Sequence, residues 1–389
     1  MSCNYAEGLS PYEHKGKLGI PEVFDDDETV EVKVAKLAEW IRHAKHVVVH
    51  TGAGISTAAG IPDFRGPRGV WTLEEKGLKP NVNISFDNAT PTLAHMGICS
   101  LVQSGHIKYV ISQNIDGLHL RSGLKRTNIS ELHGNMFVAR CSYCDREFIR
   151  PTSVPTVGQK EIGMDCPWVK AGGRICRGKL RDNILDWEDN LPDKDLDMAE
   201  MHSTIADLSI SLGTTLQIIP AGNLPLKAKK NNGKFVVVNL QPTKHHKKAD
   251  LVIHTQVDKV ISKIAAILGV EIQPYLPEID PTCILQTLQD STNSWKTRSL
   301  SDWTIAAASV SKMKSIAAAI KDNKPKSVSR KKRKTDKVNE PISDHEEEQD
   351  LFVPTRPPEK QEICLAELSR KNTEIVPNGV HPKDSNESD

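Results

Sequence analysis

The 389-residue sequence predicts an α/β fold built on a parallel sheet, and this expectation depends on two patterns. First, short apolar runs rich in Val and Ile recur between longer helical or polar stretches, and each run is continuous, as is typical of strands covered on both faces. Second, each run ends in polar or glycine-containing sequence, at the strand end where doubly wound sheets bind ligands. The predicted strands lie within 46–52, 109–116, 208–215, 234–241 and 250–257.

Two stretches next to these strands have the spacing of amphipathic helices. Residues 30–44, before the first strand, and residues 257–270, after the last, repeat apolar side chains along one face. We therefore expect a short N-terminal segment (1–29), one α/β domain (30–272) and a tail (273–389). The tail is rich in Pro, Ser, Thr, Lys and Glu and has no strand pattern, so we expect it to be mostly disordered.

The overall composition excludes several classes of protein. Lys and Arg total 51 against 50 Asp and Glu, so the chain as a whole has no charge excess that would attract nucleic acid. No run reaches the ~18 consecutive apolar residues of a membrane helix, and the first residues lack the apolar region of a signal peptide. We therefore expect neither a membrane protein nor a secreted one, and the eight cysteines should be reduced thiols.

Charges in the tail are strongly segregated. Residues 312–337 contain eleven Lys and Arg against two Asp, with the uninterrupted run Arg330–Lys334 at the centre, and six acids follow within 340–350. Such a run fits a nuclear-import signal or a nucleic-acid contact, and its flexible setting favours import over a merely solvating segment. We therefore expect a nuclear protein that binds the import machinery. For residues 301–323 we expect at most a weak helix without a partner.

Four cysteines have the spacing of a metal site. Two residues separate Cys141 from Cys144, so one tight turn can aim both sulfurs at one ion. Nine residues separate Cys166 from Cys176, and a Gly-Gly pair at 172–173 can make the return turn between them. Four thiolates suit the closed tetrahedron of a structural Zn²⁺. The alternatives are a redox dithiol or unrelated buried thiols, and we favour one zinc ion that folds the module without catalysing.

A glycine loop follows the first predicted strand directly. Gly52 and Gly54 allow close approach of the backbone to a phosphate, and the next helix would direct its N-terminal N–H groups there. Thr57 stands where the dehydrogenase fingerprint has its third glycine, and no acidic residue ends a second strand about 20 residues later. The loop therefore predicts a phosphate site but disfavours an ordinary hydride-transferring dehydrogenase.

Five features occur in a fixed order along the chain: GAGIS (52–56), GIPDFR (60–65), QNIDGLH (113–119), ELHG (131–134) and the four cysteines. Together they resemble the sirtuin family of NAD-dependent protein deacylases over about residues 10–272. Four details resemble the sirtuin-6 branch of that family. They are the N-terminal string MSCNYAEGLSPY, the short loop 64–77, the wide second cysteine spacing, and ILDWEDNLP (184–192) where most relatives have Phe-Gly-Glu.

The resemblance implies a Rossmann-like NAD domain with a small zinc-binding module inserted in it, here at about 134–190, and a cleft that admits acyl-lysine. NAD is then a consumed co-substrate. The acyl oxygen attacks the nicotinamide ribose, nicotinamide leaves, and an alkylamidate intermediate forms that ends as O-acyl-ADP-ribose. The peptide would add as a strand along residues 184–192, with Asp186 and Trp187 near the acyl-lysine entrance.

The resemblance also assigns roles to residues, and His133, Asn114 and Asp116 are the expected catalytic ones. An imidazole with an unperturbed pKa of about 6.5 is largely neutral near pH 7, so His133 can accept a proton from a ribose hydroxyl. Asn114 and Asp116 would bind ribose hydroxyls and the nicotinamide amide, and Gln113 would contact the ribose. The other implied NAD contacts are Gly52, Ala53, Gly54, Ser56 and Thr57 near the diphosphate, Asp63, Phe64, Arg65 and Trp71 in the cofactor loop, and Gly213, Thr214, Thr215, Asn239, Gln241 and Val257 around the adenosine.

The resulting expectation is an NAD-dependent protein-lysine deacylase that acts on acetyl and longer acyl groups of histone tails and other chromatin proteins. Two alternatives stay open. The same NAD site would serve mono-ADP-ribosyl transfer, in which a protein nucleophile attacks the ribose, and only the products separate the two reactions. A non-catalytic chromatin module that senses NAD or acyl-lysine would not need a base beside the ribose.

Overall fold

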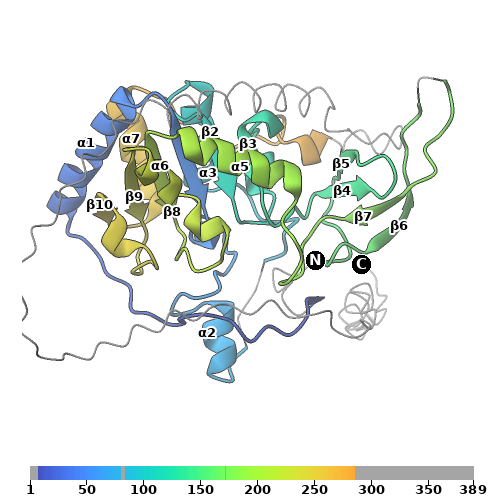
Figure 1. Cartoon of the computed structure of the whole chain (residues 1–389), viewed down its shortest axis with the longest axis horizontal. Coiled ribbons are helices and arrows are strands. Elements are labelled where there is room, and N and C mark those ends of the chain that lie inside the picture. The colour runs from blue at the N-terminus through green and yellow to red at the C-terminus, as the bar shows by residue number, and fades with distance from the viewer. Residues whose placement is uncertain (1–7, 80–83, 171, 285–389) are drawn as a thin grey trace, which may run out of the picture.

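The computed structural model describes residues 8–79, 84–170 and 172–284, and a six-stranded parallel sheet lies at its centre (Figure 1). The strand order is β10-β9-β8-β1-β2-β3. The strands are β1 (Val47–Thr51), β2 (Tyr109–Ser112), β3 (Ile129–Glu131), β8 (Leu208–Leu212), β9 (Lys234–Val238) and β10 (Leu251–Ile253). Five of them lie within the five predicted runs. The sequence did not indicate β3, because its three residues give no apolar run long enough to recognise.

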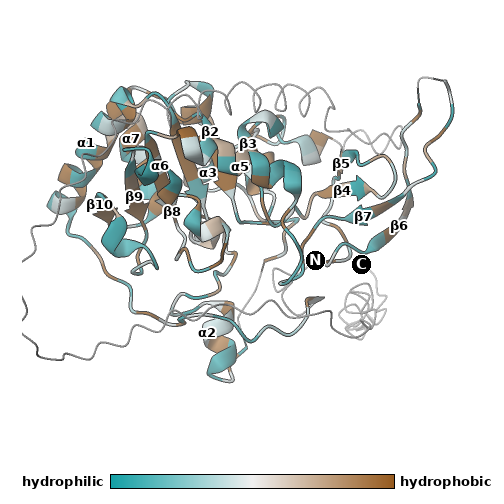
Figure 2. Ribbon diagram, viewed as in Figure 1, coloured by the Kyte–Doolittle hydropathy of each residue, from teal (hydrophilic) through white to brown (hydrophobic). Residues whose placement is uncertain are grey.

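Helices cover both faces of this sheet. The helices are α1 (Asp27–His43), α2 (Val70–Glu75), α3 (Leu93–Gln103), α4 (Leu118–Arg121), α5 (Asp193–Ile205), α6 (Leu226–Lys230) and α7 (Val257–Leu268). One apolar core joins α1, α3 and α7 to one face of the sheet, and α5 and α6 share a second core with the other face. Figure 2 shows the result, with hydrophobic strands enclosed between helices whose outer surfaces are hydrophilic. Every residue of β1 and β8 is buried, which explains why these runs are continuous.

A small four-stranded module is inserted between β3 and α5 and lies at one end of the molecule in Figure 1. Its antiparallel sheet has the order β5-β4-β7-β6. The strands are β4 (Val138–Cys141), β5 (Glu147–Ile149), β6 (Glu161–Asp165) and β7 (Lys179–Asp182). The predicted fold class, a Rossmann-like parallel sheet with a small cysteine-bearing module, is confirmed.

Packing continues past Ile272, where we expected the domain to end. Asp280 is completely buried, and its carboxylate pairs with the Arg121 guanidinium on α4 at 2.8 Å. The predicted basic run, the weak helix at 301–323 and the expected disorder of the tail lie outside the described residues. Within the described ranges, none of the helices combines the length and apolar character that a membrane crossing requires.

Candidate active site and metal centre

The loops after β1 and β8 meet at the point where the strand order reverses. The Gly52 N–H donates to the carbonyl of Leu212 at 3.1 Å, and the Gly54 N–H donates to that of Gly213 at 2.9 Å. A Cβ on Gly54 would lie 2.8 Å from the Gly213 Cα, so this approach requires glycine. Doubly wound sheets bind ligands at such a switch point. The structure therefore brings the predicted phosphate loop and the 213–215 turn together.

A hydrogen-bonded network connects the glycine loop to the end of β2. The Ser56 hydroxyl donates to the Asp116 carboxylate at 2.7 Å, and the Asn114 amide donates to the Gly52 carbonyl at 3.0 Å and to the Ser56 oxygen at 3.3 Å. Burial raises the pKa of Asp116, while the bonds from Ser56 and from the Leu118 N–H oppose that rise. Three predicted residues from two strand ends thus form one unit.

His133 is held in the tautomer that a base requires. Its Nδ1 lies 2.9 Å from the Gln113 carbonyl oxygen. A carbonyl only accepts, so Nδ1 carries the proton and Nε2 keeps a free lone pair. Burial lowers the pKa of His133, although the Gln113 bond opposes this, and the ring is therefore neutral at pH 7. The Gln113 side chain reaches the Thr214 hydroxyl at 3.4 Å, which ties this unit to the turn after β8.

The predicted cofactor loop folds back over its own backbone. The Asp63 carboxylate accepts from the Gly66 N–H at 3.1 Å, and burial raises its pKa, so this carboxylate supports the loop. The Phe64 carbonyl accepts from the Trp71 N–H at 3.0 Å, and the two rings are 4.8 Å apart. The Arg65 guanidinium lies 4.6 Å from the Trp71 ring centre. Phe64, Arg65 and Trp71 therefore form one cluster, as expected for a loop that closes over a ligand.

The two predicted substrate residues also join this cluster. The Trp187 ring is 5.1 Å from the Trp71 ring. The N-terminal segment contacts both Trp187 and Asp186. The Tyr12 ring stacks on Trp187 at 5.3 Å, and the Ser10 hydroxyl donates to Asp186 at 2.7 Å. Sequence reasoning missed Ser10 and Tyr12, since the segment before α1 has no periodicity or motif that indicates a contact.

The residues expected around the adenosine lie in several different environments. The Asn239 amide donates to the Gln241 carbonyl at 2.8 Å, and the Gln241 amide donates to the Arg65 carbonyl at 3.1 Å. The Thr215 carbonyl accepts from a backbone N–H of the 239–249 loop. The Val257 side chain, at the first position of α7, packs in the apolar core. Ala53 begins a short 3₁₀ turn, and the Thr57 hydroxyl donates to the Gly54 carbonyl.

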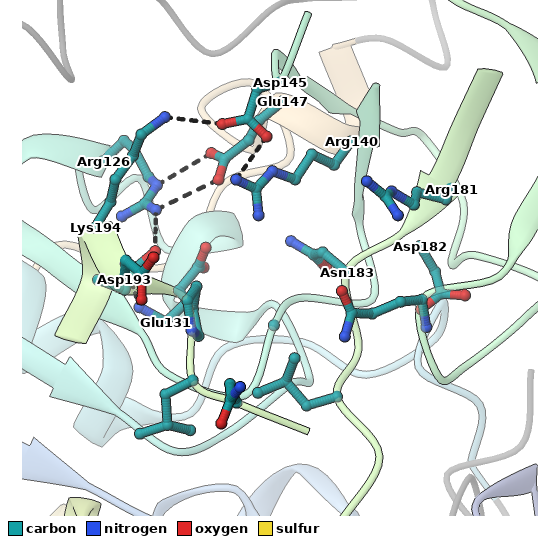
Figure 3. Close-up of a pocket in the computed structure, with 17 residues that line it drawn as sticks. Arg126, Glu131, Arg140, Asp145, Glu147, Arg181, Asp182, Asn183, Asp193 and Lys194 are labelled. Atoms are coloured by element: carbon teal, nitrogen blue, oxygen red, sulfur yellow. Dashed lines mark hydrogen bonds and ion pairs between the residues drawn. The ribbon is translucent and has the colours of Figure 1, made fainter. Parts of the chain in front are cut away.

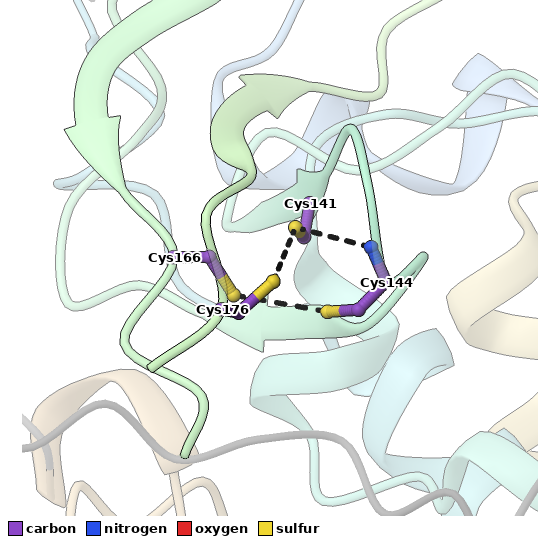
Figure 4. Close-up of side chains that lie close together, drawn as sticks. All are labelled: Cys141, Cys144, Cys166 and Cys176. Atoms are coloured by element: carbon purple, nitrogen blue, oxygen red, sulfur yellow. Dashed lines mark hydrogen bonds between the residues drawn. The ribbon is translucent and has the colours of Figure 1, made fainter. Parts of the chain in front are cut away.

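The four cysteine sulfurs converge in the small module (Figure 4). All of them lie within 4.8 Å of one another, with Cys141 and Cys176 at 3.8 Å and Cys144 and Cys166 at 3.7 Å. A tetrahedral zinc ion with Zn–S distances of about 2.3 Å has sulfur–sulfur edges of about 3.8 Å. Burial raises the pKa of Cys141, but the Cys144 and Tyr143 N–H groups outweigh it and lower the value to about 7. The donor set fits one zinc ion and leaves no open position.

A hairpin accounts for the wide second spacing. Val169 and Ile175 form an antiparallel bridge between Cys166 and Cys176, and Gly173 takes a left-handed φ of +73° in the turn. The return turn therefore includes one of the two predicted glycines, and it brings two sulfurs together that are far apart in sequence.

The fold and the glycine loop place this chain among Rossmann-like nucleotide-binding proteins, and the His133 imidazole contacts the Gln113 carbonyl directly after β2. The comparisons with known proteins are more specific. The chain matches the model of the Sir2 family over residues 78–220. It is 61% identical over 284 residues to the NAD-dependent protein deacetylase Sirt6 of Drosophila melanogaster, which covers 72% of this chain and 90% of the fly protein.

A plant protein gives a longer match. The NAD-dependent protein deacetylase SRT1 of Arabidopsis thaliana is 46% identical over 331 residues, covering 83% of this chain and 68% of the plant protein. The solved structure of Sir2 with a p53 peptide and NAD is 32% identical with a TM-score of 0.46, covering 61% of this chain and 99% of that one. This chain therefore belongs to the Sir2 family, the sirtuins, and its resemblance to the sirtuin-6 branch is confirmed.

Proposed function

We propose that this protein is an NAD-dependent protein-lysine deacylase that removes acetyl and longer acyl groups from histones and other chromatin proteins. The products are the free lysine, nicotinamide and O-acyl-ADP-ribose. The observation that carries the proposal is His133, whose Nδ1 bond to Gln113 leaves Nε2 as a proton acceptor beside the nucleotide loops. Two relatives with high identity are named NAD-dependent protein deacetylases, which supports the same reaction.

The side chains divide the work of this reaction. NAD, when bound, supplies an electrophilic ribose carbon and nicotinamide as the leaving group. The Asn114 amide and the Asp116 carboxylate orient the ribose and the nicotinamide amide, and Ser56 holds that carboxylate in place. His133 accepts a ribose hydroxyl proton at Nε2, which contributes about 10²–10⁴-fold for a well-placed base. Phe64 and Trp71 close over the site and exclude water, which limits hydrolysis of NAD.

The four cysteines hold one structural zinc ion in this proposal. A four-thiolate site has no free position for a substrate, so the metal supplies folding energy to the small module and no catalysis. The module then forms one wall of the peptide cleft, with Asp186 and Trp187 at the acyl-lysine entrance.

Product analysis tests the function. Purified full-length protein is incubated with NAD and with acetyl- or myristoyl-lysine histone peptides, and every product is identified by mass spectrometry. We expect free-lysine peptide plus O-acyl-ADP-ribose from the native protein and none from His133→Ala. His43→Ala, an exposed histidine on α1, is the matched control and should keep full activity.

Two other outcomes favour the alternative functions. ADP-ribose attached to protein, with the peptides unchanged, would identify a mono-ADP-ribosyltransferase that uses the same NAD residues. No consumption of NAD would leave a binding module that senses NAD or acyl-lysine.

A nuclear location completes the proposal. The basic run Arg330–Lys334 binds the import machinery, and the protein then meets its chromatin substrates. Replacing the five residues with alanines should move a fluorescently tagged protein into the cytoplasm. Replacement of the acidic run within 340–350 by neutral amides is the control and should leave the protein nuclear. Unchanged nuclear retention of the alanine variant would contradict the role of the basic run.

A further inference from the structure

A polar cavity of about 420 Å³ lies between the small module and the start of α5 (Figure 3). The paired strands β4 and β7 line it on one side, and residues 190–195 line it on another. None of the residues expected to bind NAD or zinc belongs to its lining. The cavity is therefore separate from the site described above, although it includes Gly134, the neighbour of the base.

Two arginines from paired positions on adjacent strands extend into this cavity. Arg140 of β4 and Arg181 of β7 are partners in the antiparallel register. Figure 3 shows their guanidinium groups directed into the same hollow, with Asn183 below them. Like charges directly opposite each other on two strands are destabilising unless something neutralises them.

Among the residues that the structure describes, ion pairs neutralise only one of these two charges. The Arg140 guanidinium pairs with the Asp145 carboxylate at 2.6 Å. The Arg181 side chain forms no hydrogen bond or ion pair with any residue that the structure describes. Glu161, the register partner of Arg181 on β6, forms no ion pair with it.

The carboxylates around the cavity do not fill this role, because five of the six already have partners. Arg126 pairs with Glu147 at 3.2 Å and with Asp195 at 2.8 Å. The buried Asp182 accepts from the Thr156 hydroxyl at 2.7 Å and from three backbone N–H groups. The other two are Asp145, bound by Arg140 and Lys194, and Glu131, bound by Asn135. The sixth, Asp193, is exposed at the start of α5.

We propose that this cavity binds a small polar molecule through a carboxylate or phosphate group held between Arg140 and Arg181. The planar guanidinium fork matches both groups, and such charge-assisted bonds are about twice as strong as neutral ones. Small-molecule sites commonly measure about 300–1,000 Å³, so the volume admits a metabolite larger than a single ion. The polar lining, which includes Asn183 and Asn190, favours a hydrophilic ligand.

Titration of the full-length protein tests the proposal, with inorganic phosphate, succinate and glycerol 3-phosphate as separate probes. Ionic strength is held constant with sodium chloride, and binding is measured by calorimetry and by the melting temperature. We expect saturable binding of at least one probe, weakened about tenfold or more in Arg181→Gln because a charge-assisted bond is lost. Arg174→Gln is the matched control, since Arg174 is an exposed arginine of the same module outside the cavity, and it should bind like the native protein.

Two further arms make the result decisive. Arg181→Lys keeps the charge but loses the planar fork, so its affinity should lie between those of the native protein and Arg181→Gln. Equal affinity of the native protein, Arg181→Gln and Arg174→Gln would show unspecific screening, and the absence of saturation with all three probes would show that no site exists. Binding of a phosphoserine peptide without binding of the free anions would assign the site to protein ligands. Each of these three results overturns the proposal.

Discussion

Asp280→Asn, an isosteric substitution, should lower the stability of the whole protein by a large amount. The Asp280 side chain is completely buried, and the Arg121 guanidinium that it neutralises is only 5% exposed. The carboxylate also accepts from the Tyr275 and Thr282 hydroxyls, each at 2.7 Å. The asparagine would keep the shape but remove the charge, and its NH₂ group would face these donors.

The expected cost follows from this geometry. Removing one partner of a buried ion pair leaves an uncompensated charge, which costs about 3–5 kcal/mol. Arg121 also donates to the Phe86 carbonyl, so it cannot turn to solvent without breaking the 86–89 loop. A loss of this size is a large fraction of the roughly 5–15 kcal/mol that stabilises a typical folded protein. At about 2–4 °C per kcal/mol for a domain of this size, the melting temperature should fall by roughly 6–20 °C.

Urea and thermal unfolding of the full-length protein, followed by circular dichroism, measure this loss. Glu200→Gln is the matched control because it breaks the exposed pair with Lys227 at 3.2 Å. That pair should contribute about 1 kcal/mol or less. The double variant Arg121→Met/Asp280→Asn removes both charges. Its loss of unfolding free energy should therefore be smaller than the sum of the losses in the single variants Arg121→Met and Asp280→Asn.

One result would refute the reasoning. If Asp280→Asn and Glu200→Gln lose the same free energy of unfolding, the buried pair does not hold residues 273–284 to the domain. A double variant whose loss equals the sum of the single losses would likewise show that the two charges do not interact.

Three other predictions concern the base, the metal and the response to acid. His133→Ala should abolish deacylation while NAD binding, measured by calorimetry, and the melting temperature change little; near-normal turnover would remove His133 from the mechanism. Purified protein should contain about one zinc ion per chain by atomic absorption, and Cys141→Ser should melt at a lower temperature; metal-free protein with normal melting would contradict this. Burial lowers the pKa of His50 and His202 to about 3 and that of His119 to about 4, from 6.5. Below pH 6.5 these three histidines therefore bind more protons in the unfolded chain than in the folded one. Each histidine should then lower the free energy of unfolding by up to about 1.4 kcal/mol per pH unit down to about pH 4; a urea midpoint unchanged between pH 7 and pH 5 would refute the prediction.

Strand burial explains how much of the fold could be predicted. The runs at β1 and β8 are recognisable because both faces of a central parallel strand are covered, which requires continuous apolar sequence. The three-residue β3 at the edge of the sheet carries no such pattern. The same limit applies to the small module, whose strand β6 is alternately exposed and half-buried and was not predicted.

The candidate site was predictable where chemistry is encoded by neighbouring residues. The Cys141–Cys144 spacing and the strings that contain Asn114, Asp116 and His133 are local patterns. The structure gathers the four cysteines in the small module, and it places the other three residues near the loops of the parallel sheet. The expected contact of Val257 with the adenosine stays a prediction, and the sequence did not indicate that the Val257 side chain packs in the core, because the start of a helix after a strand shows no periodicity of its own.

From the sequence alone one can predict the parallel sheet, the glycine loop after β1 and the cluster of four cysteines, because each depends on residues close together in the chain. Which distant groups become partners depends on the tertiary structure and has no local signal in the sequence. The Tyr12 ring stacks on Trp187, and Asp280 neutralises Arg121. Arg140 lies beside Arg181 on the paired strands β4 and β7. These pairings follow from how the chain returns to the same place in space. Burial then sets how much each contact contributes to stability, because a charge removed from water is costly without a partner. That partner is distant in the sequence and cannot be recognised from a local pattern.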